Sequence, residues 1–188
     1  MVKRLSDRIS LSEKDGSTSI IITSRKEDSS QTMLFTWMIF WSIAGVVVLT
    51  QLFGDYDTEQ KMFMYVWMAF WLYFEYTVVI AFFWRKYGFE RILIKGNELL
   101  YKKDIKGAGR VISVDLREIT QVKTIDYEEK SFSFILKKSY WNLGYEKIQI
   151  TYGRDKVLQI GSELYNVEAL KVINYIDKKI KSTSKNID

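Results

Sequence analysis

The sequence predicts an α+β membrane protein in which a two-helix transmembrane hairpin is followed by an antiparallel β domain. Two apolar runs, 33–53 and 62–84, are each long enough to cross a hydrocarbon core of about 30 Å as a helix. Short β-branched and aromatic segments separated by turn residues come next, and a C-terminal segment has the spacing of an amphipathic helix. We therefore divide the chain into segments 1–31, 32–84 and 85–188.

The N-terminal segment has the pattern of a β-hairpin. Residues 8–11 and 19–22 are rich in strand-forming side chains, and Asp15-Gly16 between them is a turn signal. Because the next segment is expected to cross the membrane and return, this hairpin is expected on the same side as the C-terminal domain. There it can pair with the sheet of that domain.

The two apolar runs are interpreted as membrane spans rather than as a signal sequence or soluble core helices. No basic region immediately precedes the first run, and no small-residue cleavage pattern follows it. Soluble helices of this length normally carry a polar stripe, whereas Glu75 is the only charge in either run. The connector 54–61 is an acidic turn, because its aspartates and glutamate outnumber the single Lys61.

The charges that flank the spans predict their orientation. Basic residues precede the first span, at Arg25 and Lys26, and four more follow the second span. Since cytoplasmic loops carry an excess of Lys and Arg, we expect a multi-pass protein with both termini in the cytoplasm. The acidic turn is then expected outside.

Residues 85–188 are interpreted as one domain of about 100 residues, a common domain size. Turn signals at 95–97, 106–110 and 153–155 separate its strand-like segments. The predicted strands are 89–94, 98–102, 110–114, 120–126, 131–136, 146–152 and 156–160. Residues 166–181 are predicted to form a helix that closes the sheet with its apolar face. This is the element order of a pleckstrin-homology-like β-barrel or sandwich, a fold that hosts unrelated functions.

The charge of the C-terminal domain predicts an anionic neighbour. The chain has 28 basic and 23 acidic residues, and the basic excess lies after the spans. Basic residues close to a membrane attract acidic lipid, so the phospholipid membrane is the predicted partner. The predicted headgroup ligands are Arg85, Lys86, Arg91 and Lys95. No basic helix or RNA-binding signature accompanies the charges, so nucleic acid is not a predicted partner.

The chain contains no cysteine and no histidine, which narrows its chemistry. Disulfides, Cys/His zinc sites, thiol redox chemistry and histidine-based catalytic triads are excluded. The glycines of 106–110 lack the spacing of a nucleotide-binding loop and are interpreted as a hairpin turn. We predict no catalytic residue, no metal site and no cofactor, and hence no enzyme activity.

Glu75 is the single residue of the spans that most strongly suggests a specific role. An acidic side chain near the bilayer centre costs roughly 2.5 to 3.5 kcal/mol on insertion scales. Three interpretations remain open. It is a protonated carboxyl bonded within the hairpin, to Thr36 or Ser42; it contacts another subunit; or it belongs to a proton or ion relay. A relay needs several polar groups in series, and these spans offer few.

The tryptophans of the spans predict how the two helices pack. Trp37 and Trp41 are four residues apart, as are Trp67 and Trp71, so each pair shares a helix face. In an antiparallel hairpin, Gly45 is expected opposite Ala69 and Ser42 near Leu72, where small residues allow close approach. Trp84 and Tyr87 are expected to anchor the hairpin at the membrane interface.

One polar segment of the C-terminal domain is a candidate interaction site. Trp141 lies close to Lys137 and Lys138. Charge runs of this kind are usually solvated loop tips. An exposed tryptophan beside two lysines would instead dip into the bilayer interface or bind a protein partner, and its exposure decides between these roles.

One arrangement of motifs runs through most of the chain. It consists of Ser19-Ile-Ile-Ile-Thr-Ser-Arg25, the tryptophan-bearing hairpin, 96–100, 110–116, 148–153, and Gly161 with Glu168-Ala169. This arrangement resembles a bacterial family of small two-span inner-membrane proteins with a pleckstrin-homology-like C-terminal domain. These are mainly turn and packing positions, so the resemblance implies a fold and the inner membrane. It brings no established activity and no catalytic residue.

Two classes of function remain. The first is a non-catalytic membrane accessory or scaffold protein, whose hairpin and basic β domain assemble with a larger membrane complex or contact acidic lipid. Its partners would be phospholipid and other membrane subunits, or further copies of the same chain. The alternative is a component of a transport or ion-conducting assembly that uses Glu75, which would require an oligomer because two spans are too few.

Overall fold

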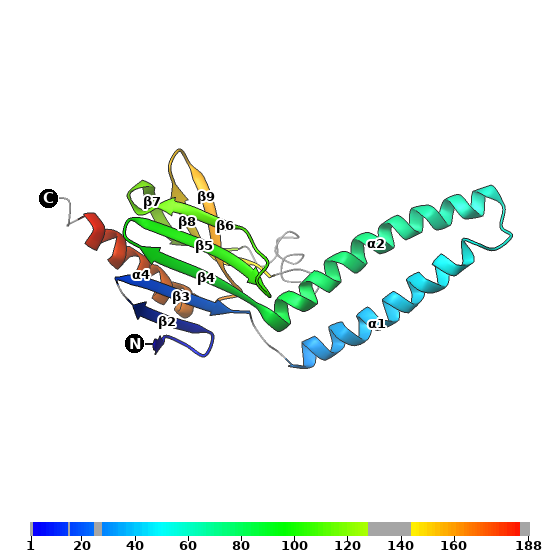
Figure 1. Ribbon diagram of the computed structural model, residues 1–188, viewed down its shortest axis with the longest axis horizontal. Helices are drawn as coiled ribbons and strands as arrows, with labels where there is room; N and C mark the ends of the chain where they lie inside the picture. Colours follow the sequence, from blue (N-terminus) through cyan, green and yellow to red (C-terminus); the bar gives the residue numbers. More distant parts are fainter. Residues whose placement is uncertain (1, 15, 25–27, 128–143, 185–188) are drawn as a thin grey trace.

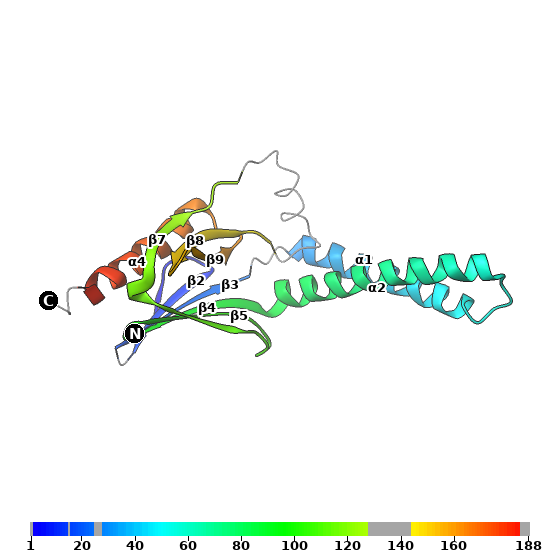
Figure 2. The ribbon, with the colours of Figure 1, turned by 90° about the horizontal axis from the view of Figure 1, so that it is seen from above.

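The computed structural model describes residues 2–14, 16–24, 28–127 and 144–184, and the chain is α+β with antiparallel sheets. A helical hairpin projects from one end of a β-rich body (Figure 1). The turn of the hairpin lies at the end farthest from that body, as both views show (Figures 1 and 2). The hairpin turn and the β domain therefore lie at opposite ends of the molecule.

The larger sheet has six antiparallel strands in chain order. They are β1 (Val2–Arg4), β2 (Ile9–Lys14), β3 (Ser17–Thr23), β4 (Gly88–Lys95), β5 (Glu98–Ile105) and β6 (Val111–Asp115). The helical hairpin is inserted between β3 and β4, which pair from Ser17 with Lys95 to Thr23 with Phe89. The expected N-terminal hairpin is thus confirmed, and it joins the sheet of the C-terminal domain.

The smaller sheet has three antiparallel strands. A 3-10 turn, η1 (Leu116–Glu118), leads into β7 (Ile119–Thr124), which pairs with β8 (Glu146–Tyr152), and β8 pairs with β9 (Lys156–Ser162). Helix α4 (Asn166–Ser184) follows and buries Ala169, Val172 and Ile176 in the same core as both sheets. Six of the seven predicted strands of this domain are confirmed, and 131–136 lies outside the described residues.

The expected form of this domain was a β-barrel or sandwich, and a closed barrel is not seen within the residues that the structure describes. Among the described strands, hydrogen bonds join six into one sheet and three into another. The two sheets meet instead through side chains, because inward residues of the larger sheet such as Ile92 and Leu99 share one core with Ile148 and Ile160 of the smaller sheet. Figure 2 shows α4 and the smaller sheet on one side of β4 and β5, whose other side is open.

Side chains alternate between the two faces of the larger sheet, as in any β-strand. On β4, Ile92 and Ile94 are buried in the core, while Arg91 and Lys95 are exposed on the open face. The open face next to the hairpin therefore carries residues of β3 and β4 that are not part of the core.

Two helices form the hairpin, α1 (Asp28–Gln51) and α2 (Thr58–Tyr87). Both are long and apolar enough to span a membrane by length and composition. Only 11% and 17% of their most apolar windows are buried inside the protein, whereas the core helix of a soluble protein is mostly buried. The apolar side chains of these helices thus face outward, away from the protein.

The connector between the helices is shorter than the predicted 54–61. Helix α2 already begins at Thr58, because the Asp57 carboxylate accepts the Gln60 N–H at 2.8 Å and the Gln60 side chain accepts the Asp57 N–H. Such a capping box fixes a helix start. Hydropathy placed the start at Met62, because the first turn of α2 is polar.

Candidate functional site

The second helix runs directly into the first strand of the C-terminal domain. Helix α2 ends at Tyr87, and the N–H of Gly88, the first residue of β4, donates to the Trp84 carbonyl. A Cβ at position 88 would lie 2.2 Å from the Trp84 ring, so glycine permits this contact. The hairpin and the larger sheet are therefore joined without a linker.

Trp84 is a packing residue and not an interfacial anchor. It is only 3% exposed, and the Lys103 ammonium of β5 lies 4.6 Å from the centroid of its ring. The hydropathy of the span does not reveal this, because the contact comes from the sheet. Tyr87, the other expected anchor, is 40% exposed and lies at the surface of the junction.

Cations surround the exposed rings at the end of α2. The Lys106 ammonium lies 4.1 Å from the Tyr87 ring centroid and 5.0 Å from that of Phe83. The Lys86 ammonium lies 5.4 Å from the Tyr87 centroid. Arg91 extends the positive charge onto the open face of β4. We refer to Lys86, Arg91 and Lys106 as the cationic collar; cations over aromatic faces are attracted by the ring quadrupole.

Sequence reasoning missed Lys106. Strand β5 returns beside β4 with Ile105 opposite Gly88, and this register carries the β5–β6 turn to the end of α2. The contact of Lys106 with the end of α2 could have been found only by pairing β4 with β5, residue by residue, starting from the Lys95-Gly96-Asn97 turn.

The β5–β6 turn that holds Lys106 is fixed by Asp104. Its carboxylate accepts the Gly107 N–H at 2.6 Å and forms an ion pair with Lys102 at 2.5 Å. The hydrogen bond from Lys102, followed by that from the Gly107 backbone, lowers the pKa of Asp104 against the opposing effect of its burial. Asp104 thereby holds the turn through short-range contacts, and its interaction with Arg91 of the collar is a longer-range attraction without an ion pair.

Arg85 is not positioned as the predicted headgroup ligand. Its side chain is 11% exposed and lies 3.7 Å from the Glu163 carboxylate, at the end of β9. Its carbonyl accepts hydrogen bonds from the Ser24 hydroxyl at 2.9 Å and the Gln31 amide at 3.2 Å. Arg85 therefore ties the two helices to the β domain.

Lys95 is also separated from the other predicted headgroup ligands. It is the last residue of β4, while Gly88 is the first. At a rise of about 3.4 Å per residue, the strand carries Lys95 roughly 24 Å from the hairpin. Of the four predicted headgroup ligands, Lys86 and Arg91 alone lie exposed near the end of α2.

A shallow hollow of about 320 Å³ opens beside these two residues, on the open face of the larger sheet. Its lining comes from the end of α2 and from the adjoining ends of β3 and β4: Ile21, Thr23, Lys86, Tyr87, Gly88, Phe89 and Arg91. Apolar side chains form its wall, and two cations lie at its rim. This combination matches a ligand that has both an anionic and an apolar part.

Glu75 bonds to the other helix of the hairpin. The Ser42 hydroxyl donates to Glu75 Oε1 at 2.7 Å, so Ser42, one of the two predicted hydroxyls, is the partner. The second oxygen, Oε2, is buried and accepts no hydrogen bond from any residue that the structure describes.

The helices approach each other at a different contact from the one expected. The Trp71 ring lies over Gly45, where a Cβ would come within 1.9 Å of it, and the indole N–H donates to the Trp41 carbonyl at 2.9 Å. Ala69 and Leu72 are exposed instead. The predicted pairing of Gly45 with Ala69 was wrong because hydropathy does not fix how a uniformly apolar helix is rotated.

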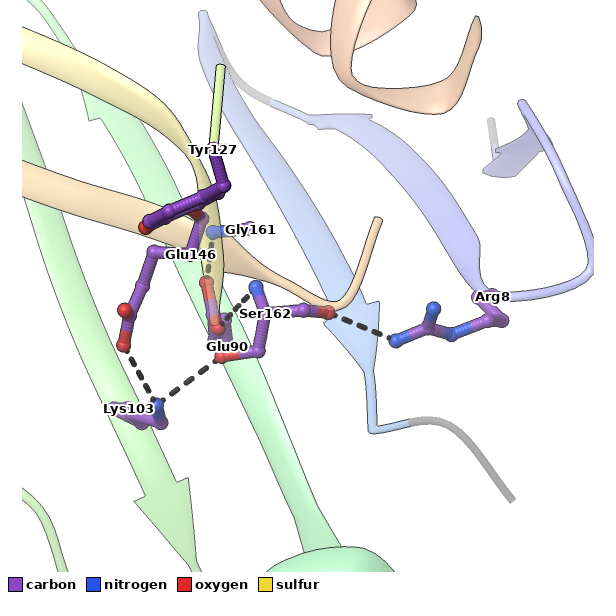
Figure 3. A network of polar contacts seen from close by, with 7 residues as sticks. All are labelled: Arg8, Glu90, Lys103, Tyr127, Glu146, Gly161 and Ser162. Atoms are coloured by element: carbon purple, nitrogen blue, oxygen red, sulfur yellow. Dashed lines mark hydrogen bonds and ion pairs between the residues drawn. The ribbon is translucent and has the colours of Figure 1, made fainter. Parts of the chain in front are cut away.

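A buried carboxylate joins the two sheets. Glu90 of β4 is fully buried and accepts the N–H groups of Gly161 at 2.6 Å and Ser162 at 2.8 Å, both in β9 (Figure 3). Burial and then the Glu90 charge raise the pKa of Tyr101, so its phenol stays neutral in the folded protein. Sequence reasoning missed Glu90, although its inward position in the alternation of β4 was a usable signal.

Further polar contacts surround Glu90. Lys103 donates to the Ser162 hydroxyl at 3.1 Å and to the Glu146 carboxylate at 3.3 Å (Figure 3). Arg8 donates to the carbonyls of Ser162 and Glu163. These contacts connect the N-terminal segment, the larger sheet and β9, and they are structural in character.

The candidate interaction residues Lys137, Lys138 and Trp141 lie outside the described residues. Within the ranges that the structure describes, no group of three or more acidic, His or Cys side chains could hold a metal ion. No family model, curated protein or solved structure matches the chain. The cationic collar and the hollow beside it are therefore assigned from geometry alone.

Proposed function

We propose that this chain is a non-catalytic accessory or scaffold protein of the bacterial inner membrane. It crosses the membrane twice, with both termini in the cytoplasm. Its β domain lies against the inner surface, where the cationic collar contacts acidic phospholipid and the remaining surface serves assembly with other membrane subunits. The observation that carries the proposal is the cluster of cations and exposed rings at the linker-free junction of α2 and β4.

The dimensions of α2 support this proposal. Helix α2 has 30 residues, which at 1.5 Å per residue gives a length of about 45 Å. A bilayer with its headgroup regions is roughly 40 to 45 Å thick. The last turn of α2, with Lys86 and Tyr87, is then at headgroup level, where tyrosines and basic side chains are favoured.

The charges at the two ends of the hairpin support the orientation. The connector side carries Asp55, Asp57 and Glu59, while the other end carries Lys86 and the collar. Since cytoplasmic flanks are enriched in basic residues, the β domain is cytoplasmic.

Lipid selectivity of the full chain tests the proposal. The protein is reconstituted in mixed vesicles of phosphatidylglycerol and phosphatidylcholine, and its tryptophan fluorescence is quenched with a brominated form of either lipid. Each basic residue near an acidic surface contributes about 1 kcal/mol, so K86Q/K106Q, which removes two, should lower the preference for acidic lipid roughly thirtyfold.

A matched double variant controls for net charge. Lys95 and Lys156 are exposed, and each lies at the end of its strand away from the hairpin. K95Q/K156Q should keep the preference of the unmodified protein. An equal loss in both double variants, or no preference in the unmodified protein, would contradict the proposed contact.

One observation supports transport as a second candidate function. The Glu75 Oε2 atom is buried without a hydrogen-bond partner among the described residues, and intramembrane carboxylates often belong to ion paths. Gentle purification from membranes separates the two candidates. Other subunits in fixed stoichiometry support the accessory role, and a homo-oligomer with Glu75 on a central polar path supports transport.

A further inference from the structure

We propose that the hollow between α2, β3 and β4 binds the headgroup of one acidic phospholipid, with the phosphate held between Lys86 and Arg91. This inference rests on the proposed membrane location and makes it specific. A general attraction to an acidic surface would involve many lipids, whereas this hollow would bind one lipid per chain and would saturate.

The pairing of Arg91 favours an external anion. In the larger sheet Arg91 lies opposite Lys102, so two cations face each other across neighbouring strands. Like charges in such positions destabilise a sheet. Lys102 forms an ion pair with Asp104 at 2.5 Å. Asp104 also attracts Arg91 from a longer distance, but no carboxylate lies within ion-pair distance of Arg91 in the part of the chain that the structure describes.

Lys86 supplies a second cation from a different element. It is exposed on the last turn of α2, it lines the same hollow as Arg91, and it likewise has no ion pair with any described carboxylate. A planar guanidinium donates two parallel hydrogen bonds to a phosphate, and an ammonium adds a point charge. The two cations are therefore complementary to a single phosphate.

The apolar wall of the hollow matches the rest of a lipid. Ile21, Tyr87 and Phe89 line it, and the Arg91 guanidinium carbon lies 5.6 Å from the Phe89 ring centroid. The hollow adjoins the exposed side of α2, along which acyl chains would run in the bilayer. A soluble anion would use the cations but would leave this wall exposed, so we assign the site to a phospholipid.

Variants at two positions of the same strand face test the site. Arg91 and Lys95 both lie exposed on the open face of β4, but only Arg91 lines the hollow. The full chain in mild detergent is titrated with dioleoyl phosphatidylglycerol or dioleoyl phosphatidylcholine, and bound lipid is counted by native mass spectrometry.

The unmodified protein should bind one phosphatidylglycerol in preference to phosphatidylcholine. R91Q should weaken that binding roughly tenfold, the scale of one lost charge-assisted contact. K95Q should change the phosphatidylglycerol affinity by less than about twofold, because Lys95 has the same charge as Arg91 but does not line the hollow. R91K, which keeps the charge but loses the planar fork, should fall between R91Q and the unmodified protein. Unchanged melting temperatures establish that each variant is folded.

Equal binding by R91Q and K95Q, or lipid uptake that does not saturate at one molecule, would overturn the site. The failure of the site is distinguishable from that of the proposed function. If the vesicle preference that depends on Lys86 and Lys106 persists while R91Q binds lipid normally, the site is wrong and the membrane role stands. If the unmodified protein prefers no acidic lipid in either experiment, both proposals fail.

Discussion

At the residue scale, Glu75 illustrates how far an acidic residue in a long apolar helix can be interpreted from sequence. Its need for a partner on the other helix follows from the cost of a bare carboxyl in lipid, and Ser42 provides it. The choice between Ser42 and Thr36 depends on the rotation of two apolar helices. That rotation is set by the Trp71 contact, which no hydropathy pattern contains.

The Ser42–Glu75 bond is expected to contribute little free energy. Such interhelical bonds average about 0.6 kcal/mol, so S42A should lower the free energy of unfolding in detergent by a similar amount. E75Q keeps an acceptor oxygen and should change it by less than about 0.5 kcal/mol. Thermal unfolding of both variants measures this. A large loss in E75Q would show that the ionised carboxylate is required.

Glu90 is expected to be far more important for stability. E90A would leave the N–H groups of Gly161 and Ser162 buried without an acceptor, at a cost of about 3 kcal/mol. E90Q retains one acceptor oxygen and should therefore lower the free energy of unfolding by less than E90A does. Glu98 on the neighbouring strand is exposed, so E98A is the control and should be near neutral. Denaturant unfolding of the three variants provides the comparison. Equal losses of stability in E90A and E98A would contradict the role of Glu90 in joining the two sheets.

At the scale of elements, the strands were more predictable than their assembly. Turn residues bounded the strands, so Lys95-Gly96-Asn97 and Gly153-Arg154-Asp155 gave β4, β5, β8 and β9 nearly correct limits. The division into two sheets was not predictable, because it depends on long-range packing around α4 and on Glu90. Two of the three collar residues, Lys86 and Arg91, were predicted from sequence, whereas Lys106 reaches the collar through the register of β4 and β5.

The contact between Gly45 and Trp71 is expected to control how the two helices pack. G45L places a side chain where the Trp71 ring lies, and overpacking of this kind costs about 2 kcal/mol. Melting temperature and the fluorescence of the tryptophans report it. A69L is the matched control, because Ala69 is exposed and a leucine there meets no helix. If A69L were the more damaging variant, the original pairing of Gly45 with Ala69 would be restored.

At the scale of the whole molecule, the absence of cysteine makes the topology directly testable. Single cysteines are introduced as D55C in the connector and K178C on the exposed face of α4. In intact cells of the host, a membrane-impermeant maleimide should label D55C only. K178C should react after the membrane is permeabilised. If D55C and K178C are both labelled in intact cells, the proposed orientation is contradicted. If neither is labelled before permeabilisation, the proposed crossing of the membrane by α1 is contradicted.

The linker-free passage from Tyr87 to Gly88 has a mechanical consequence. A helix that is too long for a thin bilayer tilts, and one in a thicker bilayer stands more upright. Trp84 packs against Gly88, and Arg85 forms an ion pair with Glu163. Because these contacts fix the junction, the larger sheet changes its orientation together with the tilt of α2. If the hairpin spans a bilayer as proposed, the local lipid thickness sets the angle between the β domain and the membrane surface.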